Sequence, residues 1–329
     1  QYTVLELLED FSAKLDDRLT DQPAVESTVR LMISAVYHRF RTNTAEGLAN
    51  AERAFELRRQ LYGATHELTI RAEQAKALHM RFGASHNWAD GTAILQKIID
   101  LNPPFMEQDH EFTIRTKNIA IMSLSGEESL VAFRDLLTEA ESKLGNGHTL
   151  TCGIRSNYAR RLKNSRDYDQ AELQLRQAIA NLEETSGKNA PIAIVWRGNL
   201  ADVFIERGND ERAKEILLPD LELAQKHLGE AHRDTMNVVR RLMQIYDRQE
   251  KSQLADDLFA DYSARLRSAT NRHALTAAYW LIAISTSSDV SRTTTSDKFL
   301  ELAAEIYLSW LAEGNRKPAA LGADVGRRI

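Results

Sequence analysis

The chain has 329 residues, a formal net charge of −5 and a single cysteine, Cys152. The negative balance argues against a dedicated nucleic-acid binder, because phosphate contacts need a concentrated basic surface. One cysteine excludes an internal disulfide and any zinc site built on several thiolates. Hydrophobic residues make up 43% and charged residues 27%, which is typical of a folded, soluble protein rather than a disordered one.

The composition favours helix, since Gly (15) and Pro (6) are scarce while Ala, Leu, Glu, Arg and Gln are abundant. The longest apolar run, residues 274–285, is too short to cross a bilayer, so we expect no membrane insertion by this chain. No signal peptide is recognisable. Because the chain starts with Gln1 rather than Met, we expect a piece of a longer protein.

In chain order, the sequence predicts a leading helix over residues 1–24 and six repeated helix hairpins over 25–270. A closing helix pair over 271–312 and a flexible tail over 313–329 follow. Pro103 and Pro104 must end a helix inside the array, because proline removes a backbone donor and restricts the residue before it. Pro219 falls inside a predicted helix and indicates either a simple bend or a hinge.

Four phrases of the form His-x-x-Thr mark the repeats, at residues 66–69, 110–113, 148–151 and 232–235. Their intervals are 44, 38 and 84 residues, and a degenerate copy, "APIA" at 190–193, lies midway in the last. Other landmarks recur at the same step of 42, namely Gly145, Gly187 and Gly229, and Ala171, Ala213 and Ala255. A period of this size is typical of solenoids.

Each repeat predicts two helices. In the first helix, apolar residues such as Tyr158, Ala159 and Leu162 share one face. The second helix begins near the spaced alanine, whose small side chain lets the two helices approach, so we expect it to be buried. The spaced glycine follows, where the end of a helix favours a left-handed residue.

The His-x-x-Thr phrase is interpreted as a joint between repeats rather than a site. We expect the Thr hydroxyl to cap the first helix and the His to lie in the link. Equivalent residues of successive repeats lie roughly 16–20 Å apart, from interaxial distances of 8–10 Å, and no ion spans that distance. We therefore expect no metal and no cofactor.

Residues 145–179 and 229–259 resemble tetratricopeptide repeats of the 42-residue, kinesin-light-chain-like kind. The family pattern is Gly-x-x-His-Pro-x-Thr-Leu followed by Asn-Leu-Ala, and this chain departs from it by lacking the Pro and by having Arg241 in place of an Asn. The resemblance implies an all-α, right-handed α-solenoid of helix hairpins. It also implies that Asn side chains on the concave side bind the backbone of an extended peptide.

The flanks indicate a narrower class. Residues 2–40 and 273–307 are similar to the lead-in and closing helices of the tetratricopeptide sensor region in bacterial transmembrane serine/threonine protein kinases. That resemblance implies a ligand-sensing region outside the cytoplasm, in the periplasm. Alternatives are a cytoplasmic sensor arm of a Walker-type nucleotide-switch regulator, or a free-standing scaffold protein. A homo-oligomer is a further open alternative.

The predicted peptide-binding surface centres on residues 155–166, which hold five basic residues and no acid. An amide offers a donor and an acceptor together, and arginine binds carboxylates in bidentate fashion. The acidic residues Asp202, Glu206 and Asp247 should fall on the same side, so the surface is mixed. The competing interpretation is a solvated helix face. The residues predicted to bind are Asn157, Arg160, Lys163, Asn199, Asn237, Arg240 and Arg241.

No residue pattern indicates catalysis. The kinase-like "HRD" at 232–234 lacks the Asn that should follow five residues after the Asp, where Val239 stands. Cys152 and His148 are one helical turn apart, but nothing supplies an oxyanion hole or an orienting third group. We expect Cys152 to be a small buried side chain.

Overall fold

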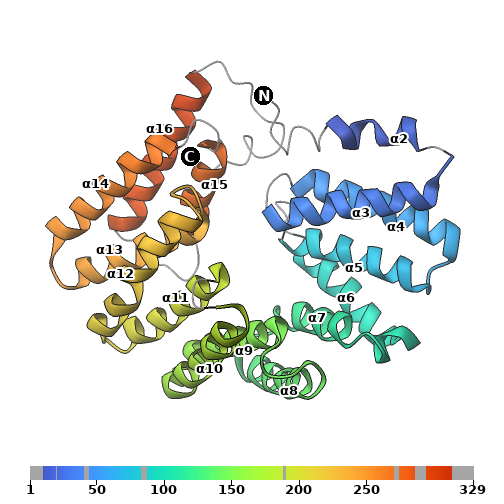
Figure 1. The fold of residues 1–329 in the computed structure, drawn as a ribbon, viewed down its shortest axis with the longest axis horizontal. Helices are drawn as coiled ribbons and strands as arrows, with labels where there is room; N and C mark the ends of the chain where they lie inside the picture. The colour runs from blue at the N-terminus through green and yellow to red at the C-terminus, as the bar shows by residue number, and fades with distance from the viewer. Residues whose placement is uncertain are drawn as a thin grey trace. The chain divides into compact units, whose positions relative to one another are not determined.

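The computed structural model describes residues 10–19, 21–40, 44–82, 87–187, 190–269, 274–285 and 294–312. These residues form helices joined by turns, with no strand among them (Figure 1). The chain divides into two compact units, residues 1–125 and 126–329. The division falls inside the predicted third repeat. The tail at 313–329 and residues 1–9 of the predicted leading helix lie outside the described residues, and the predicted segment boundaries stay predictions.

Unit 1 (residues 1–125) stacks its helices in chain order, with α3 on α4, α4 on α5, α5 on α6 and α6 on α7. The pair Pro103–Pro104 ends α6 as predicted, and Asn102 closes that helix in the left-handed region at φ 39°. The elements of this unit are α2 (Leu15–Arg18), α3 (Pro23–Phe40), α4 (Thr44–Tyr62), α5 (Glu67–Phe82), α6 (Trp88–Leu101), the 3-10 turn η1 (Pro104–Glu107) and α7 (His110–Ile121).

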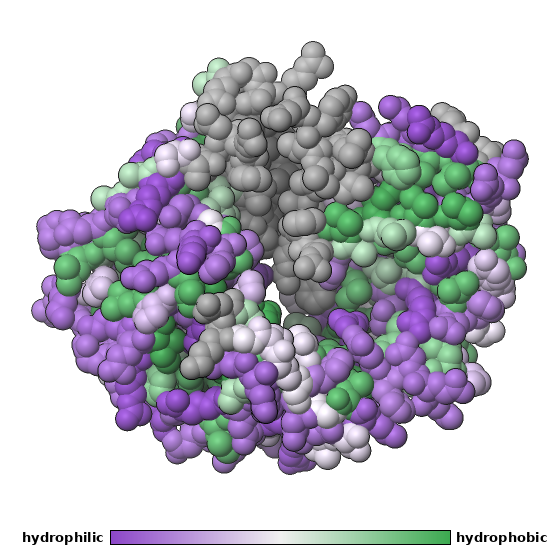
Figure 2. All heavy atoms as spheres, viewed as in Figure 1, coloured by the Kyte–Doolittle hydropathy of each residue, from purple (hydrophilic) through white to green (hydrophobic). Residues whose placement is uncertain are grey.

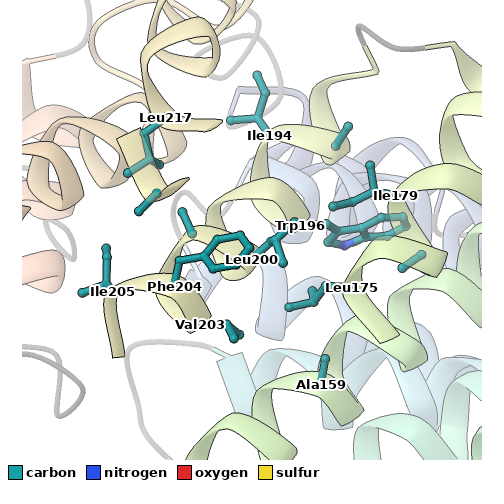
Figure 3. Packing of buried hydrophobic residues seen from close by; sticks show 14 of the residues in the cluster. Ala159, Leu175, Ile179, Ile194, Trp196, Leu200, Val203, Phe204, Ile205 and Leu217 are labelled. Carbon is teal, nitrogen blue, oxygen red and sulfur yellow. The ribbon is translucent and has the colours of Figure 1, made fainter. Parts of the chain in front are cut away.

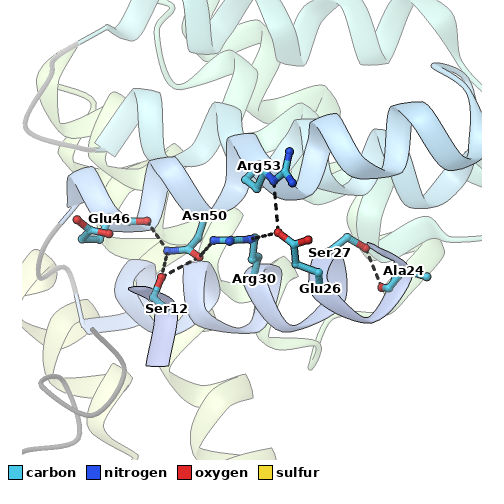
Figure 4. Close-up of polar contacts among 8 residues, drawn as sticks. All are labelled: Ser12, Ala24, Glu26, Ser27, Arg30, Glu46, Asn50 and Arg53. Atoms are coloured by element: carbon cyan, nitrogen blue, oxygen red, sulfur yellow. Dashed lines mark hydrogen bonds and ion pairs between the residues drawn. The ribbon is translucent and has the colours of Figure 1, made fainter. Parts of the chain in front are cut away.

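The interior of unit 1 is unusually polar (Figure 4). Glu26 of α3 accepts hydrogen bonds from Arg30 at 2.8 Å and from Arg53 of α4 at 3.3 Å. Arg30 also donates to Asn50 at 3.1 Å, and Asn50 exchanges hydrogen bonds with Ser12. All but Arg53 are buried, and burial of charge is tolerable here because each charged group is paired.

Among the described residues, unit 2 (residues 126–329) contains the hairpins α9/α10, α11/α12, α13/α14 and α15/α16, and the first helix α11 also contacts α9 and α13. On the face seen in Figure 2, hydrophilic side chains predominate over the described part of this unit, with hydrophobic side chains among them. The elements are α8 (Gly126–Leu144), α9 (Thr149–Asn164), α10 (Tyr168–Ser186), α11 (Pro191–Glu206), α12 (Asp210–His227), α13 (Arg233–Arg248), α14 (Ser252–Ala269), α15 (Ala274–Ser285) and α16 (Thr294–Ala312).

The core of unit 2 is formed between hairpins rather than within one. Figure 3 shows side chains of α9, α10, α11 and α12 gathered in one cluster around Trp196, Leu200 and Phe204. The three spaced alanines are all 0% exposed, which confirms that they sit where paired helices approach. The spaced glycines have φ of +87°, +82° and +84°, so the expected positive φ, which favours glycine, is also confirmed. Stacked hairpins of this kind confirm the predicted all-α solenoid class within each unit.

The His-x-x-Thr phrase is a joint, but the capping residue was predicted wrongly. The His, not the Thr, precedes the helix: His148 Nδ1 accepts from the backbone N–H of Leu150 at 3.2 Å. His232 does the same for α13. An extended backbone at the His brings its ring nitrogen onto the free N–H groups of the first turn.

The Thr instead ties the first turn to the chain before it. Thr151 donates to the carbonyl of Ala140, and Thr235 donates to the carbonyl of Gly229 at 2.7 Å. The phrase at residues 110–113 is an exception, because Asp109 caps α7 there. The joint is therefore made by two side chains with separate partners.

Pro219 lies inside α12, which continues past it to His227. None of the described helices is both long and apolar enough to span a membrane.

Candidate functional site

A cavity of about 380 Å³ lies in unit 2, with walls formed mainly by α9, α11 and α13. We call it the cavity below. Six of the seven residues predicted to bind a ligand line it, and only Asn157 does not. Those six are Arg160, Lys163, Asn199, Asn237, Arg240 and Arg241.

The repeat brings these side chains together. Positions separated by 42 residues occupy equivalent places on successive first helices, so Asn157, Asn199 and Arg241 form one row along α9, α11 and α13. Because α9 contacts α11 and α11 contacts α13, neighbouring members of a row lie on adjacent helices. A single period thus places donors from three helices on one wall.

Arg241 differs from its predicted role, because its guanidinium is already paired. It makes a bidentate contact with Asp202 of α11, at 2.7 and 2.8 Å, and its side chain is 11% exposed. Burial by itself would raise the pKa of Asp202, but Arg241 beside it lowers the pKa below its usual value. Gly198 makes room for the pair, since an added Cβ would lie 2.9 Å from Arg241 Nη1. Arg241 therefore forms part of the cavity surface as a pair with Asp202 and does not offer an unpaired cation to a ligand.

Two cations on the wall remain unpaired. Arg160 and Lys163 of α9 are half-buried and have no hydrogen-bond or ion-pair partner among the residues that the structure describes. The amide of Asn237 on α13 is likewise half-buried and unpartnered within the described ranges. Arg240 donates to Gln244 at 3.2 Å.

The two other amides are held in place. Asn199 donates to Ser156 Oγ at 3.1 Å, which links α11 to α9. Asn157 is half-buried on α9, close to the cavity in sequence but not on its wall. The three predicted amides therefore differ, because Asn199 is oriented by Ser156, Asn237 lies open on the wall and Asn157 lies off the wall.

Acidic groups also reach the cavity, so the mixed character expected from the sequence is present. Asp202, Glu206 and Asp234 line it, and Asp234 is paired with Arg233 at 3.1 Å. Asp247, which was expected on the same side, is not among the lining residues. It accepts a hydrogen bond from Thr295 of α16 at 2.9 Å.

Two arginines of unit 2, the buried Arg155 and the partly buried Arg197, were missed at the sequence level. Arg155 binds Glu141 of α8 and, at 2.8 Å each, Gln174 and Gln177 of α10. Arg155 and Arg197 are 42 residues apart, and so are their partners Glu141 and Glu183. The repeat period could therefore have identified this recurring ion pair from the sequence.

Arg197 repeats the arrangement one hairpin later. It bonds Glu183 of α10 at 3.2 Å and Asp220 of α12 at 2.7 Å. Burial raises the pKa of Asp220 to about 6, although the adjacent Arg197 opposes the shift. These arginines connect hairpins behind the cavity and are not on its wall.

The described residues show no arrangement for catalysis. They contain no group of three or more His, Cys, Asp or Glu side chains placed to hold a metal. Cys152 is 0% exposed, as expected for a buried side chain, and burial raises the pKa of its thiol. His232 uses Nδ1 to cap α13.

Residues 194–234 match the family model for the tetratricopeptide repeat, which confirms the predicted resemblance for the hairpin of α11 and α12. This repeat begins with "APIA" in place of the His-x-x-Thr phrase. The family match therefore depends on the pattern of its helices and not on that phrase. A search among curated proteins gave no match.

Among solved structures, the chain is similar to nearly identical TPR-like repeats of a Podosopora anserina protein described as a kinesin light chain. Identity is 13% and the TM-score 0.38, over 73% of this chain and 93% of that chain. It is also similar to BtubC (BKLC) from P. vanneervenii, at 17% identity and a TM-score of 0.41, over 84% of this chain and 94% of that chain. Both TM-scores are low, so the tetratricopeptide character of this chain is supported by the family-model match and by its own hairpin geometry instead.

Proposed function

We propose that this chain is a non-catalytic protein-interaction module and that the cavity binds a segment of a partner protein. The observation that supports this most is a set of half-buried polar groups on the cavity wall that have no partner within the described part of the chain, namely Arg160, Lys163 and Asn237. Partly desolvated polar groups without partners cost free energy, so a ligand that supplies those partners gains affinity. Among the described residues, these groups form no hydrogen bond or ion pair between helices.

An extended protein segment suits this wall. It exposes backbone N–H and C=O groups along its length, and a side-chain amide such as that of Asn237 can bind either of them. Asn199 is held by Ser156, so its orientation is set before a ligand arrives. Preorganisation of this kind lowers the entropic cost of binding.

The test is partner capture from a cell extract, comparing the wild type with Arg160→Ala/Lys163→Ala and with Asn237→Ala. Arg176→Ala is the matched control, because Arg176 is an exposed cation on α10 paired with Glu172 and does not line the cavity. We expect the cavity variants to lose about tenfold or more in recovery while the control retains it. Equal recovery by all variants would contradict the proposed function.

We further propose that the module is the ligand-sensing region of a bacterial transmembrane serine/threonine protein kinase. The resemblance of residues 2–40 and 273–307 to the flanks of such sensor regions supports this. Reading the coding sequence upstream of Gln1 tests it: a kinase domain followed by a membrane span is expected. A Walker motif there would favour the nucleotide-switch regulator instead, and the kinase proposal would be abandoned.

The sensor proposal implies an extracytoplasmic location. We therefore treat cells with a membrane-impermeant, amine-reactive label after permeabilising only the outer membrane. Exposed lysines such as Lys251 of unit 2 should then be modified. Labelling only after the inner membrane is broken would place the chain in the cytoplasm.

A further inference from the structure

We propose that the anionic group selected by the cavity is a phosphomonoester, carried by a phosphorylated serine or threonine of the partner segment. This rests only on the proposal that the cavity binds a partner segment, not on the sensor role or the extracytoplasmic location, and it specifies the chemistry of that segment.

The charge on the wall supports a dianion. Five cationic and three carboxylate side chains line the cavity, which leaves a formal excess of two positive charges. A phosphomonoester carries about −1.5 to −2 at pH 7, whereas a carboxylate carries −1 and would leave one charge uncompensated. The cations are Arg160, Lys163, Arg233, Arg240 and Arg241, and the carboxylates are Asp202, Glu206 and Asp234.

The internal ion pairs account for two of the five cations, and two of the other three, Arg160 and Lys163, lie on α9, while Arg240 on α13 donates to Gln244. Arg241 is neutralised by Asp202, and Arg233 by Asp234. Glu206 is exposed, so water screens its charge. Arg160 and Lys163 stay unpaired among the described residues and are three positions apart, which places them side by side on one face of α9.

The donors also match the acceptors of a phosphate. A phosphate group presents three strong acceptor oxygens, one more than a carboxylate. Arg160 offers a planar fork of N–H donors, and Lys163 offers a compact ammonium with three. The open amide of Asn237 supplies a further donor from α13. Because these groups are half-buried, their attraction for an anion is stronger than that of fully exposed side chains.

The experiment measures binding of fluorescein-labelled peptide pools to the full chain by anisotropy. The pools share randomised flanking positions and differ only at the centre, which is phosphoserine, glutamate or serine. We expect the phosphoserine pool to bind about tenfold more tightly than the glutamate pool, and inorganic phosphate to compete with it. Binding should weaken steeply as salt rises.

Substitutions show which side chains are responsible for the preference for phosphoserine. Arg160→Ala/Lys163→Ala should remove the preference for phosphoserine, whereas Lys163→Arg, which keeps the charge, should retain most of it. Arg176→Ala should leave all affinities unchanged. Circular dichroism melting shows whether each variant is folded, and none of these side chains contributes to the core.

Equal affinity for the phosphoserine and glutamate pools, or no measurable binding of any pool, overturns the phosphate inference. So does a phosphoserine preference that survives Arg160→Ala/Lys163→Ala. The capture experiment decides the proposed function separately. If the cavity variants lose partners while phosphoserine is not preferred, the cavity binds a segment of another chemistry and only the phosphate inference falls.

Discussion

Unit 1 and unit 2 are built from similar helix hairpins but hold them together differently. In unit 1 the charged side chains of Glu26 and Arg30 are buried between helices, and apolar residues form small clusters. In unit 2 a large apolar cluster joins neighbouring hairpins, and unpaired cations lie on a cavity wall. Both units bury charge, since Asp220 of unit 2 is buried against Arg197, but unit 2 also holds polar groups on a cavity wall where a ligand can reach them.

This difference has a physical consequence. Hydrophobic burial is insensitive to pH and tolerates similar side chains, whereas a buried ion pair depends on every partner being present and charged. Unit 1 should then respond sharply to loss of a single charge, and unit 2 to loss of apolar volume. Hydrogen exchange with mass spectrometry on the full chain reports the two units separately.

The largest effect is expected in the apolar core of unit 2. Phe204 is 2% exposed, and Phe204→Ala should lower the free energy of unfolding of this unit by about 3–5 kcal/mol, from lost burial and the cavity left behind. Leu218→Ala on α12 is the control, because Leu218 is 46% exposed and the change should stay within about 0.5 kcal/mol. Comparable losses from both variants would mean that the apolar cluster does not hold the hairpins.

The second test addresses the polar interior of unit 1. Glu26→Leu leaves Arg30 buried without its carboxylate and should destabilise unit 1 by about 3 kcal/mol. The double variant Glu26→Leu/Arg30→Met should recover most of that loss, because replacing both partners removes the unpaired charge. If the double variant is as unstable as the single one, the ion pair is not the source of the effect.

The two units should also respond to pH in opposite directions. Burial lowers the pKa of His79 in unit 1 from 6.5 to about 4, where it is hydrogen-bonded to Ser34 and lies beside His38. The folded state resists protonation, so unit 1 loses stability as pH falls from 6.5 towards 4, by on the order of 3 kcal/mol at most.

Unit 2 contains the reverse case. The pKa of Asp220 is raised from 3.8 to about 6, so the folded state binds the proton first. Its contribution to stability is complete below 3.8 and is lost as pH rises through 6. Unfolding of each unit measured across this range should show opposite slopes, and Asp220→Asn should flatten the slope of unit 2. Parallel slopes that persist in both units would contradict the assignment.

The smallest effects come from two helical glycines. An added Cβ at Gly47 would lie 2.3 Å from His79 Cε1, so Gly47→Ala should cost unit 1 about 1–3 kcal/mol. Gly153 on α9 has nothing within 4 Å of that position, so Gly153→Ala should stabilise unit 2 by about 0.5–1 kcal/mol through helix propensity. Thermal melting distinguishes the two, and equal signs would show that space at Gly47 is not limiting.

Much of the fold could be predicted because the residues that recur with the repeat are ones whose size is constrained by helix packing. Only a small residue fits at Ala171, Ala213 and Ala255, so their spacing reports the contact between paired helices directly. The wall of the cavity followed from the same period, since one step of 42 residues places Asn199 and Arg241 on adjacent helices.

What could not be predicted depends on side-chain geometry. Asp202 and Arg241 were both assigned to one surface, but sequence spacing does not show that two side chains 39 residues apart form a bidentate pair. Histidine seldom appears among preferred capping residues, so Thr was the natural expectation at each joint. Glu26 and Arg30 are one helical turn apart, as in an ordinary solvated pair, and nothing in the sequence marks them as buried.

A ligand held by the cavity should contact the first helices of unit 2. Hydrogen exchange of the full chain, with and without a captured partner, measures where it binds. We expect added protection in α9, α11 and α13 around Arg160 and Asn237, with little change in α10, α12 and α14. Protection confined to α10, α12 and α14, or to unit 1, would contradict it.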